Sequence, residues 1–295
     1  MSKKKTSKQK KEPDPKDQFK DWLKETWERA IEPATDSEVF DPRWVIAERN
    51  VKLLINQKKW KKHVAAFEEL VPVDEHKNFF IHFDNSEIDH GNFISYRFPC
   101  GVSFFRAKFK SKIVSFREAV FAAGGVDFSE ADFDAEDVNF REAKFLGSTT
   151  KFYSTKFGSS SVSFSKATFG RGSVSFLNSD FGRGDVFFAM AAIECEVFDI
   201  SFCKFGGRLL FQGDSESPSS RISGELLARG IQFPALTSFS NRAFEKVPNF
   251  VGSTFLVPPD LTEVKVAPPP RWKGRCGSPR SNNRRKNEMS LVTVS

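Results

Sequence analysis

Residues 126–145 read VDFSEADFDAEDVNFREAKF, and this stretch decides the fold. It contains a β-branched residue, a Phe two positions later, a small residue three after that, and a second Phe two further on. The same frame recurs every twelve residues in nine consecutive blocks from Val102 to Phe205. A fixed period that keeps buried-type residues in register is typical of a stacked repeat array.

The two Phe columns are the predicted structural core, because stacked rings bury large apolar areas without a polar atom to satisfy. Of the 34 Phe residues, only Phe19, Phe40 and Phe67 lie outside residues 79–255. The core residues that we expect to point inward are Phe104, Phe109, Phe116, Phe121, Phe128, Phe133, Phe140, Phe145, Phe152, Phe157, Phe164, Phe169, Phe176 and Phe181.

The spacing within each block favours short strands over helices. An amphipathic helix would place apolar residues three and four apart, whereas these blocks place them at offsets 0, 2, 5 and 7. Side chains two residues apart share one face of an extended segment, and the links between blocks are rich in turn residues, as in Gly182-Arg183-Gly184-Asp185. No block can bury its own Phe pair, so neighbouring blocks must stack.

Upstream of the blocks, Phe83, Ile88, Phe93 and Phe98 follow one another at intervals of five residues. This pattern resembles the pentapeptide-repeat family. The resemblance implies an all-β fold, a right-handed quadrilateral parallel β-helix, in which the central Phe of each pentapeptide and the small residue two before it point inward. Each block would be two pentapeptides with a two-residue corner insertion, so that two blocks form one coil. A left-handed hexapeptide β-helix is the nearest alternative, but alternating five and seven does not match its period of six.

The chain divides into a solenoid with a segment on either side. We expect the following organisation: a disordered basic tail at 1–16, a helical segment and N-terminal cap at 17–75, a β-helix at 76–256 with an irregular insertion at 213–230, and a Pro-rich, basic, disordered tail at 257–295. Because an open β-helix end exposes apolar side chains and unpaired backbone groups, the helices after Pro42 are predicted to cap the first coil. Residues 17–32 form an amphipathic pattern that would dock on the body or on a partner or membrane surface.

The net charge of +7 belongs to the two ends of the chain. Residues 1–16 carry +5 and residues 271–295 carry +6, which leaves −4 on residues 17–270. Solvated tails explain this distribution, and contact with nucleic acid or anionic lipid is the alternative. With no apolar run of membrane-spanning length, no signal sequence and no Cys-x-x-Cys pair, we expect a bacterial, cytoplasmic protein, peripheral to the membrane in the alternative case. Cys203 fills a slot that Ala fills elsewhere and is interpreted as a small core residue.

No motif in the sequence points to catalysis, so we expect no enzyme, no catalytic residue, no cofactor and no small-molecule substrate. His76, His82, Asp84, Asp89 and His90 are the densest group of possible metal ligands. We interpret them as ordinary surface positions and predict no metal site, because His82 and Asp84 flank an inward Phe.

The acidic run consists of Asp127, Glu130, Asp132, Asp134, Glu136 and Asp137. It raises the possibility of a DNA mimic, since some pentapeptide-repeat proteins resemble B-DNA and bind type II topoisomerases. A coil of two blocks instead stacks Asp132 between Lys108 and Lys156, and it places Glu130 beside Arg106 and Asp127 beside Lys151. Charge pairing between coils then explains the cluster without a ligand.

Three functions remain open from the sequence. The first is a non-enzymatic solenoid that presents a protein-interaction or scaffold surface to an unidentified protein partner. The second is a peripheral membrane- or nucleic-acid-associated protein, targeted by its basic tails and N-terminal helix. The third is a DNA-mimic binder of a topoisomerase. The frame also predicts that Phe140 is buried and that Phe105, one residue out of register, is exposed.

Overall fold

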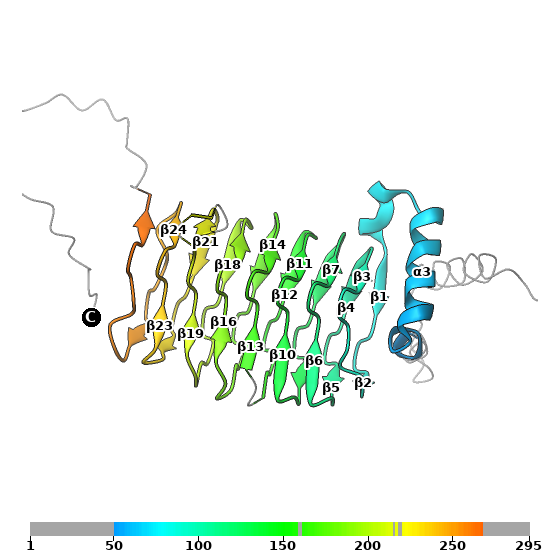
Figure 1. The fold of residues 1–295 in the computed structure, drawn as a ribbon, viewed down its shortest axis with the longest axis horizontal. Coiled ribbons are helices and arrows are strands. Elements are labelled where there is room, and N and C mark those ends of the chain that lie inside the picture. Colours follow the sequence, from blue (N-terminus) through cyan, green and yellow to red (C-terminus); the bar gives the residue numbers. More distant parts are fainter. Residues whose placement is uncertain (1–49, 159–160, 215, 218–219, 268–295) are drawn as a thin grey trace, which may run out of the picture.

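The computed structural model describes residues 50–158, 161–214, 216–217 and 220–267. These residues form a parallel β-solenoid of about eight stacked coils, with helix α3 (Gln57–Leu70) across its N-terminal end (Figure 1). Residues 50–54, before α3, are also helical. The 3-10 helix η1 (Val73–Asn78) follows α3, and the elements named after η1 are short strands. The all-β, parallel β-helix prediction is therefore confirmed.

Each coil has four faces, named here first to fourth in the order in which the chain passes through them. The first face contains β1 (Phe80–His82), β4 (Gly101–Ser103), β8 (Gly125–Asp127), β12 (Thr149–Lys151), β15 (Ser173–Ser175), β18 (Val197–Asp199) and β21 (Glu225–Leu227). The second face contains β2 (Glu87–Ile88), β5 (Lys108–Phe109), β9 (Asp132–Phe133), β22 (Gln232–Phe233) and β25 (Thr254–Phe255). Single β-bridges continue the second face through Lys156, Asp180 and Lys204.

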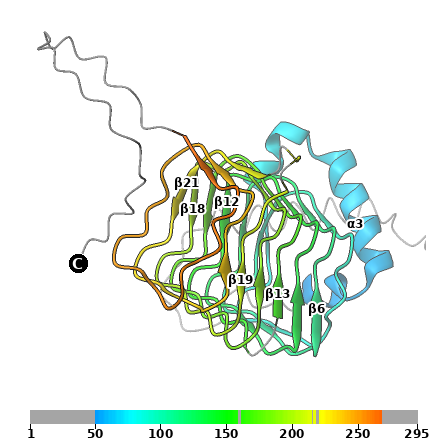
Figure 2. The same ribbon diagram turned by 60° about the vertical axis from the view of Figure 1, so that its left-hand side comes forward.

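The other two faces complete the coil, and Figure 2 shows the stacked strands of successive coils lying side by side. The third face contains β6 (Ile113–Ser115), β10 (Asp137–Asn139), β13 (Ser161–Ser163), β16 (Val186–Phe187), β19 (Leu209–Leu210) and β23 (Thr237–Ser238). The fourth face contains β3 (Arg97–Phe98), β7 (Val120–Phe121), β11 (Lys144–Phe145), β14 (Thr168–Phe169), β17 (Ala192–Ile193), β20 (Arg221–Ile222), β24 (Ala243–Phe244) and β26 (Lys265–Val266).

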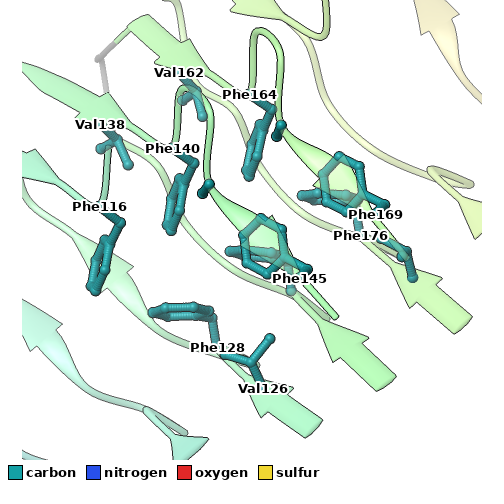
Figure 3. Packing of buried hydrophobic residues seen from close by; sticks show 14 of the residues in the cluster. Phe116, Val126, Phe128, Val138, Phe140, Phe145, Val162, Phe164, Phe169 and Phe176 are labelled. Atoms are coloured by element: carbon teal, nitrogen blue, oxygen red, sulfur yellow. The ribbon is translucent and has the colours of Figure 1, made fainter. Parts of the chain in front are cut away.

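Two twelve-residue blocks close one coil in the regular part of the solenoid. Strand β4 pairs with β8 so that Val102 lies beside Val126, its counterpart two blocks later. The ring of Phe140 stacks on those of Phe116 and Phe164, at centroid distances of 5.1 and 4.9 Å and with nearly parallel planes (Figure 3). Residues twelve apart meet differently, because Phe128 contacts Phe140 edge to face at 5.6 Å. The predicted coil of two blocks is confirmed.

All fourteen Phe residues of the expected core are buried. The position two residues before the second Phe of each block, which is called here the small slot, is not purely apolar, however. Thr155 Oγ1 donates to the carbonyl of Phe128 at 2.8 Å, Ser179 Oγ donates to that of Phe152, and Cys203 Sγ donates to that of Phe176 at 2.9 Å. Cys203 is thus a small core residue, as predicted, and it also continues an internal ladder of hydrogen bonds between neighbouring coils.

The corners of the coil place ordinary residues in the left-handed region of φ. The second residue after the first Phe position of each block recurs there every twelve positions from Arg106 (φ 55°) to Phe202 (φ 58°). This conformation costs a non-glycine residue roughly 1–2 kcal/mol. At each such corner the backbone N–H donates to a carbonyl of the next coil, as Glu130 does to Tyr153 at 2.8 Å. Stacking and cross-coil hydrogen bonds therefore stabilise a turn that the local sequence disfavours.

The N-terminal cap covers the open end of the first coil. Trp60 of α3 is buried against the rings of Phe83, Tyr96 and Phe98, and its indole N–H donates to the carbonyl of Arg97 at 3.0 Å. The hydroxyl of Tyr96 donates to the carbonyl of Leu54, also at 3.0 Å. The predicted capping role is confirmed for residues 50–70, whereas the amphipathic pattern at 17–32 lies outside the described residues.

The expected irregular insertion at 213–230 is present as a lengthened coil, through which the solenoid continues: Ile222 of β20 pairs with Ile193, and β21 pairs with β18. Two other expectations need correction. Strand β26 pairs with β24, so the coils extend to Val266, past the expected boundary at 256. Phe105 is half-buried rather than exposed, since the guanidinium carbon of Arg106 lies 4.8 Å from its ring centroid.

A Phe140→Ala variant measures the strength of the Phe stack. We expect a loss of about 3–5 kcal/mol in the free energy of unfolding, because the rings of the neighbouring coils hold their positions and leave a cavity. The measurement is a denaturant titration followed by circular dichroism. The control, Phe105→Ala, removes a half-buried ring outside the stack and should cost about 1 kcal/mol or less. Equal losses in the two variants would contradict the assignment of the stack as the core.

Candidate interaction surface

The residues considered as metal ligands do not converge. His82 Nδ1 lies 3.2 Å from Asp84 Oδ2, while His90 Nε2 lies 2.9 Å from the carbonyl of Asn92. Burial raises the pKa of Asp84, but hydrogen bonds from His82 and Ser103 outweigh it and hold that pKa below its usual value. Within the described ranges, no three His, Cys, Asp or Glu side chains are grouped as a metal ion would require.

His76 was expected on the surface with the other possible metal ligands, and this expectation is wrong. Its side chain is buried under the ring of Phe67, at a centroid distance of 4.9 Å, and its Nε2 lies 2.9 Å from the carbonyl of Val71. The turn of η1 folds the imidazole back under α3, so His76 helps to seat the cap.

The described cysteines are unsuited to nucleophilic chemistry. Burial raises the pKa of the Cys100 and Cys195 thiols to about 12 and raises that of Cys203 further. The thiolate is the reactive form of cysteine, so all three are protonated at neutral pH. Cys276 lies outside the described residues.

An alternating column of charge runs along the second face. Glu87, Lys108, Asp132, Lys156, Asp180 and Lys204 are neighbours on successive coils. The predicted position of Asp132 between Lys108 and Lys156 is therefore confirmed. Two further predicted pairs are also present, since Arg106 Nε lies 2.7 Å from Glu130 Oε2 and Lys151 Nζ lies 3.9 Å from Asp127 Oδ2.

Other ion pairs lie over the solenoid, most of them between neighbouring coils and two between residues adjacent in the chain. They join Lys110 to Glu87, Lys112 to Glu136, Arg117 to Glu118, Arg141 to Glu142, Arg208 to Asp185, Arg221 to Glu245 and Arg229 to Asp199. Hydrogen bonds from the side chain and then the backbone of Arg208 hold the pKa of Asp185 below its usual value. The acidic run is thus interleaved with basic partners, an arrangement that argues against a uniformly acidic face.

An apolar strip breaks this charged surface at the corner between the first and second faces. Backbone hydrogen bonds from Ser154 N to Leu177 O and from Asn178 N to Ser201 O place Tyr153, Leu177 and Phe202 on three consecutive coils. Tyr153 is 43% exposed and Phe202 is 53% exposed, while Leu177 is half-buried. We call these three residues the corner strip.

The residue type at these corner positions varies from coil to coil. The position of Tyr153 is occupied by Phe105 and Leu177 in two coils and by Ser129 and Ser201 in two others, and Asn178 occupies that of Phe202. The Phe202 ring lies against Gly230, where an added Cβ would come within 2.4 Å of the ring. Polar residues therefore suffice for folding at this corner, and the aromatic residues need another explanation.

Arg242 is a buried structural residue that the sequence did not predict. It stands two residues before Phe244, in the slot that Ala191 occupies two coils earlier, and it is fully buried. Its Nε donates to the carbonyl of Phe211 at 2.6 Å, Nη1 to that of Ala191 at 2.8 Å and Nη2 to that of Phe188 at 2.8 Å. The register of the Phe columns, continued through Phe239 and Phe244, would have revealed it.

The guanidinium replaces donors that the insertion displaces. In regular coils the small-slot carbonyl accepts from the backbone of the next coil, as Ala167 O does from Ala192 N at 2.9 Å. At the lengthened coil, Ala191 O accepts from Arg242 instead. Burial lowers the pKa of Arg242 to about 10, which leaves the side chain charged at neutral pH.

No protein-family model matches the chain, and the searches of characterised proteins and of solved structures returned no similar protein. In the part of the chain that the structure describes, no helix is both long and apolar enough to cross a bilayer.

An Arg242→Ala variant tests the structural role of the buried guanidinium. We expect the free energy of unfolding to fall by roughly 3–5 kcal/mol, because buried carbonyls lose their donor and a large side chain is removed. The measurement is a denaturant titration. The neighbouring Arg221→Ala variant removes an exposed ion pair and should cost less than about 1 kcal/mol. A loss no greater for Arg242→Ala than for Arg221→Ala would contradict this role.

A Lys156→Asp variant tests the alternating column, since it places a third carboxylate between Asp132 and Asp180. At low salt we expect a loss of about 0.5–1 kcal/mol, which shrinks near 1 M salt because like charges are screened. The comparison is Lys156→Gln, which removes the attraction without adding repulsion and should cost less. Equal and salt-independent losses in thermal unfolding would show that the column contributes no electrostatic pairing.

Proposed function

We propose that the protein is a non-enzymatic, cytoplasmic scaffold whose solenoid binds a protein partner along the corner strip. The observation that carries this proposal is the exposure of Tyr153 and Phe202 on neighbouring coils, at positions where some other coils have Ser or Asn. Exposed aromatic side chains on a rigid surface are typical anchors of protein interfaces. The proposal includes a relationship to pentapeptide-repeat proteins and the right-handed winding that such a relationship implies.

The surroundings of the strip suit a binding surface better than a catalytic one. The strip lies on a convex corner, and the nearby carboxylates Asp127 and Asp199 face Lys151 and Arg229, respectively. A rigid backbone also lowers the cost of binding, because little ordering is needed when the partner docks. A partner would therefore bury the rings within a rim of paired charges.

The test is a double variant, Tyr153→Ser with Phe202→Asn, which installs residue types that other coils tolerate at these positions. Immobilised full-length protein captures partners from a lysate of its source, and mass spectrometry quantifies them. We expect the double variant to reduce recovery of the specific partner at least about tenfold, because each lost anchor is worth about 1 kcal/mol or more.

The control variant is Leu146→Ser, which removes a side chain that is 47% exposed on the fourth face. Recovery of the partner should be unchanged with this control. The proposal is wrong if the native protein captures no partner, or if both variants retain the partner to the same extent.

A further inference from the structure

The outer surface of the N-terminal cap carries a concentrated positive charge. Trp60, Val64 and Phe67 of α3 are buried toward the solenoid. The exposed lysines of the first two turns are Lys58, Lys59, Lys61 and Lys62, and we call them the cap lysine face. With 3.6 residues per turn, they cover about 160° of the helix, centred opposite the buried side.

Stability does not account for this arrangement. The first turn of α3 contains no acidic residue, and lysines there face the positive end of the helix dipole. Lysines close together on one surface also repel each other. The cap lysine face thus reduces the stability of the helix that holds it, and this cost points to a ligand that is itself negatively charged.

On the second face of the solenoid, lysines alternate with carboxylates. Lys108 and Lys156 lie beside carboxylate residues of neighbouring coils in the strand register, and Lys204 Nζ lies 3.8 Å from Asp180 Oδ2. Among the described residues, by contrast, none of the four lysines of the cap lysine face takes part in an ion pair. The cap therefore offers four adjacent positive charges to an external anion at one end of the molecule (Figure 1).

We propose that the cap lysine face binds the phosphate backbone of nucleic acid without sequence specificity. Lysine is a point charge that pairs with phosphate oxygens, and Lys58 and Lys62 lie about 6 Å apart along the helix axis, a spacing that reaches successive phosphates. The N-terminus of α3 adds its own positive potential. This binding is independent of the corner strip and of the partner proposed for it.

A bilayer surface fits the same charges less well. An interfacial helix inserts its apolar face between lipids while its lysines flank that face. In α3 the apolar side is already buried against Phe83 and Phe98, and Ala65 is the exposed apolar residue beside the lysines. The exposed side of α3 itself therefore offers charge without a large apolar side chain, as binding to a phosphate backbone requires, and Ile55, which precedes the helix and is 44% exposed, is the one large apolar side chain beside the lysines in the described residues.

The experiment compares two triple variants of the full-length protein that lose the same charge. The test variant is Lys58→Gln, Lys61→Gln and Lys62→Gln, and the matched control is Lys108→Gln, Lys156→Gln and Lys204→Gln on the second face. Fluorescence anisotropy measures binding to a labelled DNA duplex of mixed sequence between about 50 and 200 mM salt. Glutamine is a good helix former, and circular dichroism verifies that both variants fold.

We expect the test variant to bind more weakly and its salt slope, d log K against d log[salt], to become shallower by about 2–3. The control should keep the slope of the native protein. Both variants retain the basic tails, so any binding by the tails contributes equally to the two measurements.

Two outcomes would overturn the proposal. One is an equal slope in the two variants, which would assign duplex binding to other parts of the chain. The other is unchanged duplex binding by the test variant together with loss of its binding to vesicles rich in phosphatidylserine, which would assign the cap lysine face to a membrane surface.

Discussion

The parallel stacking of Phe rings from alternate blocks is the constraint on which the rest of the structure depends. Rings such as Phe128 and Phe152 lie 5.0 Å apart with planes inclined by only 8°. A shift of one residue would turn each inward side chain outward, so the stack fixes the register of all four faces. Once the register is fixed, every outward side chain has a defined neighbour on the next coil. This fixed register determines both the strained corners and the alternating charges.

The sequence predicted the regular coils well because their pattern is local and repeated. Asp132 could be placed between Lys108 and Lys156 from the coil length alone. The predictions failed where a contact depends on a local path of the chain that the twelve-residue repeat does not determine. Residues 213–230 lack the twelve-residue frame, yet their strands pair with the coil before them, so the solenoid continues through this segment. His76 is buried because a turn folds it under Phe67, and Phe105 is partly covered by Arg106, its own neighbour in the chain.

On the fourth face, the side chain in the small slot differs between the middle coils and the coils near the two ends of the solenoid. Ala fills this slot in the middle coils, where the flanking Phe rings occupy the core. Tyr96 fills it in the first coil and bonds to the cap, while Arg242 fills it after the insertion and supplies three donors to earlier coils. Larger, polar side chains are thus placed where the regular pattern of backbone hydrogen bonds is incomplete.

The distribution of charge differs between the solenoid and its cap. Paired charges on the solenoid limit long-range attraction between its faces and other molecules, since opposite charges on neighbouring coils cancel within about one Debye length. The cap lysine face keeps its field because no carboxylate of the described chain pairs with it. At about 4.8 Å per coil, the corner strip lies roughly 15–25 Å along the solenoid from the first coil, which the cap covers. A protein held at the strip and a nucleic acid held at the cap would therefore occupy separate surfaces, and the stacked coils would set the distance between them.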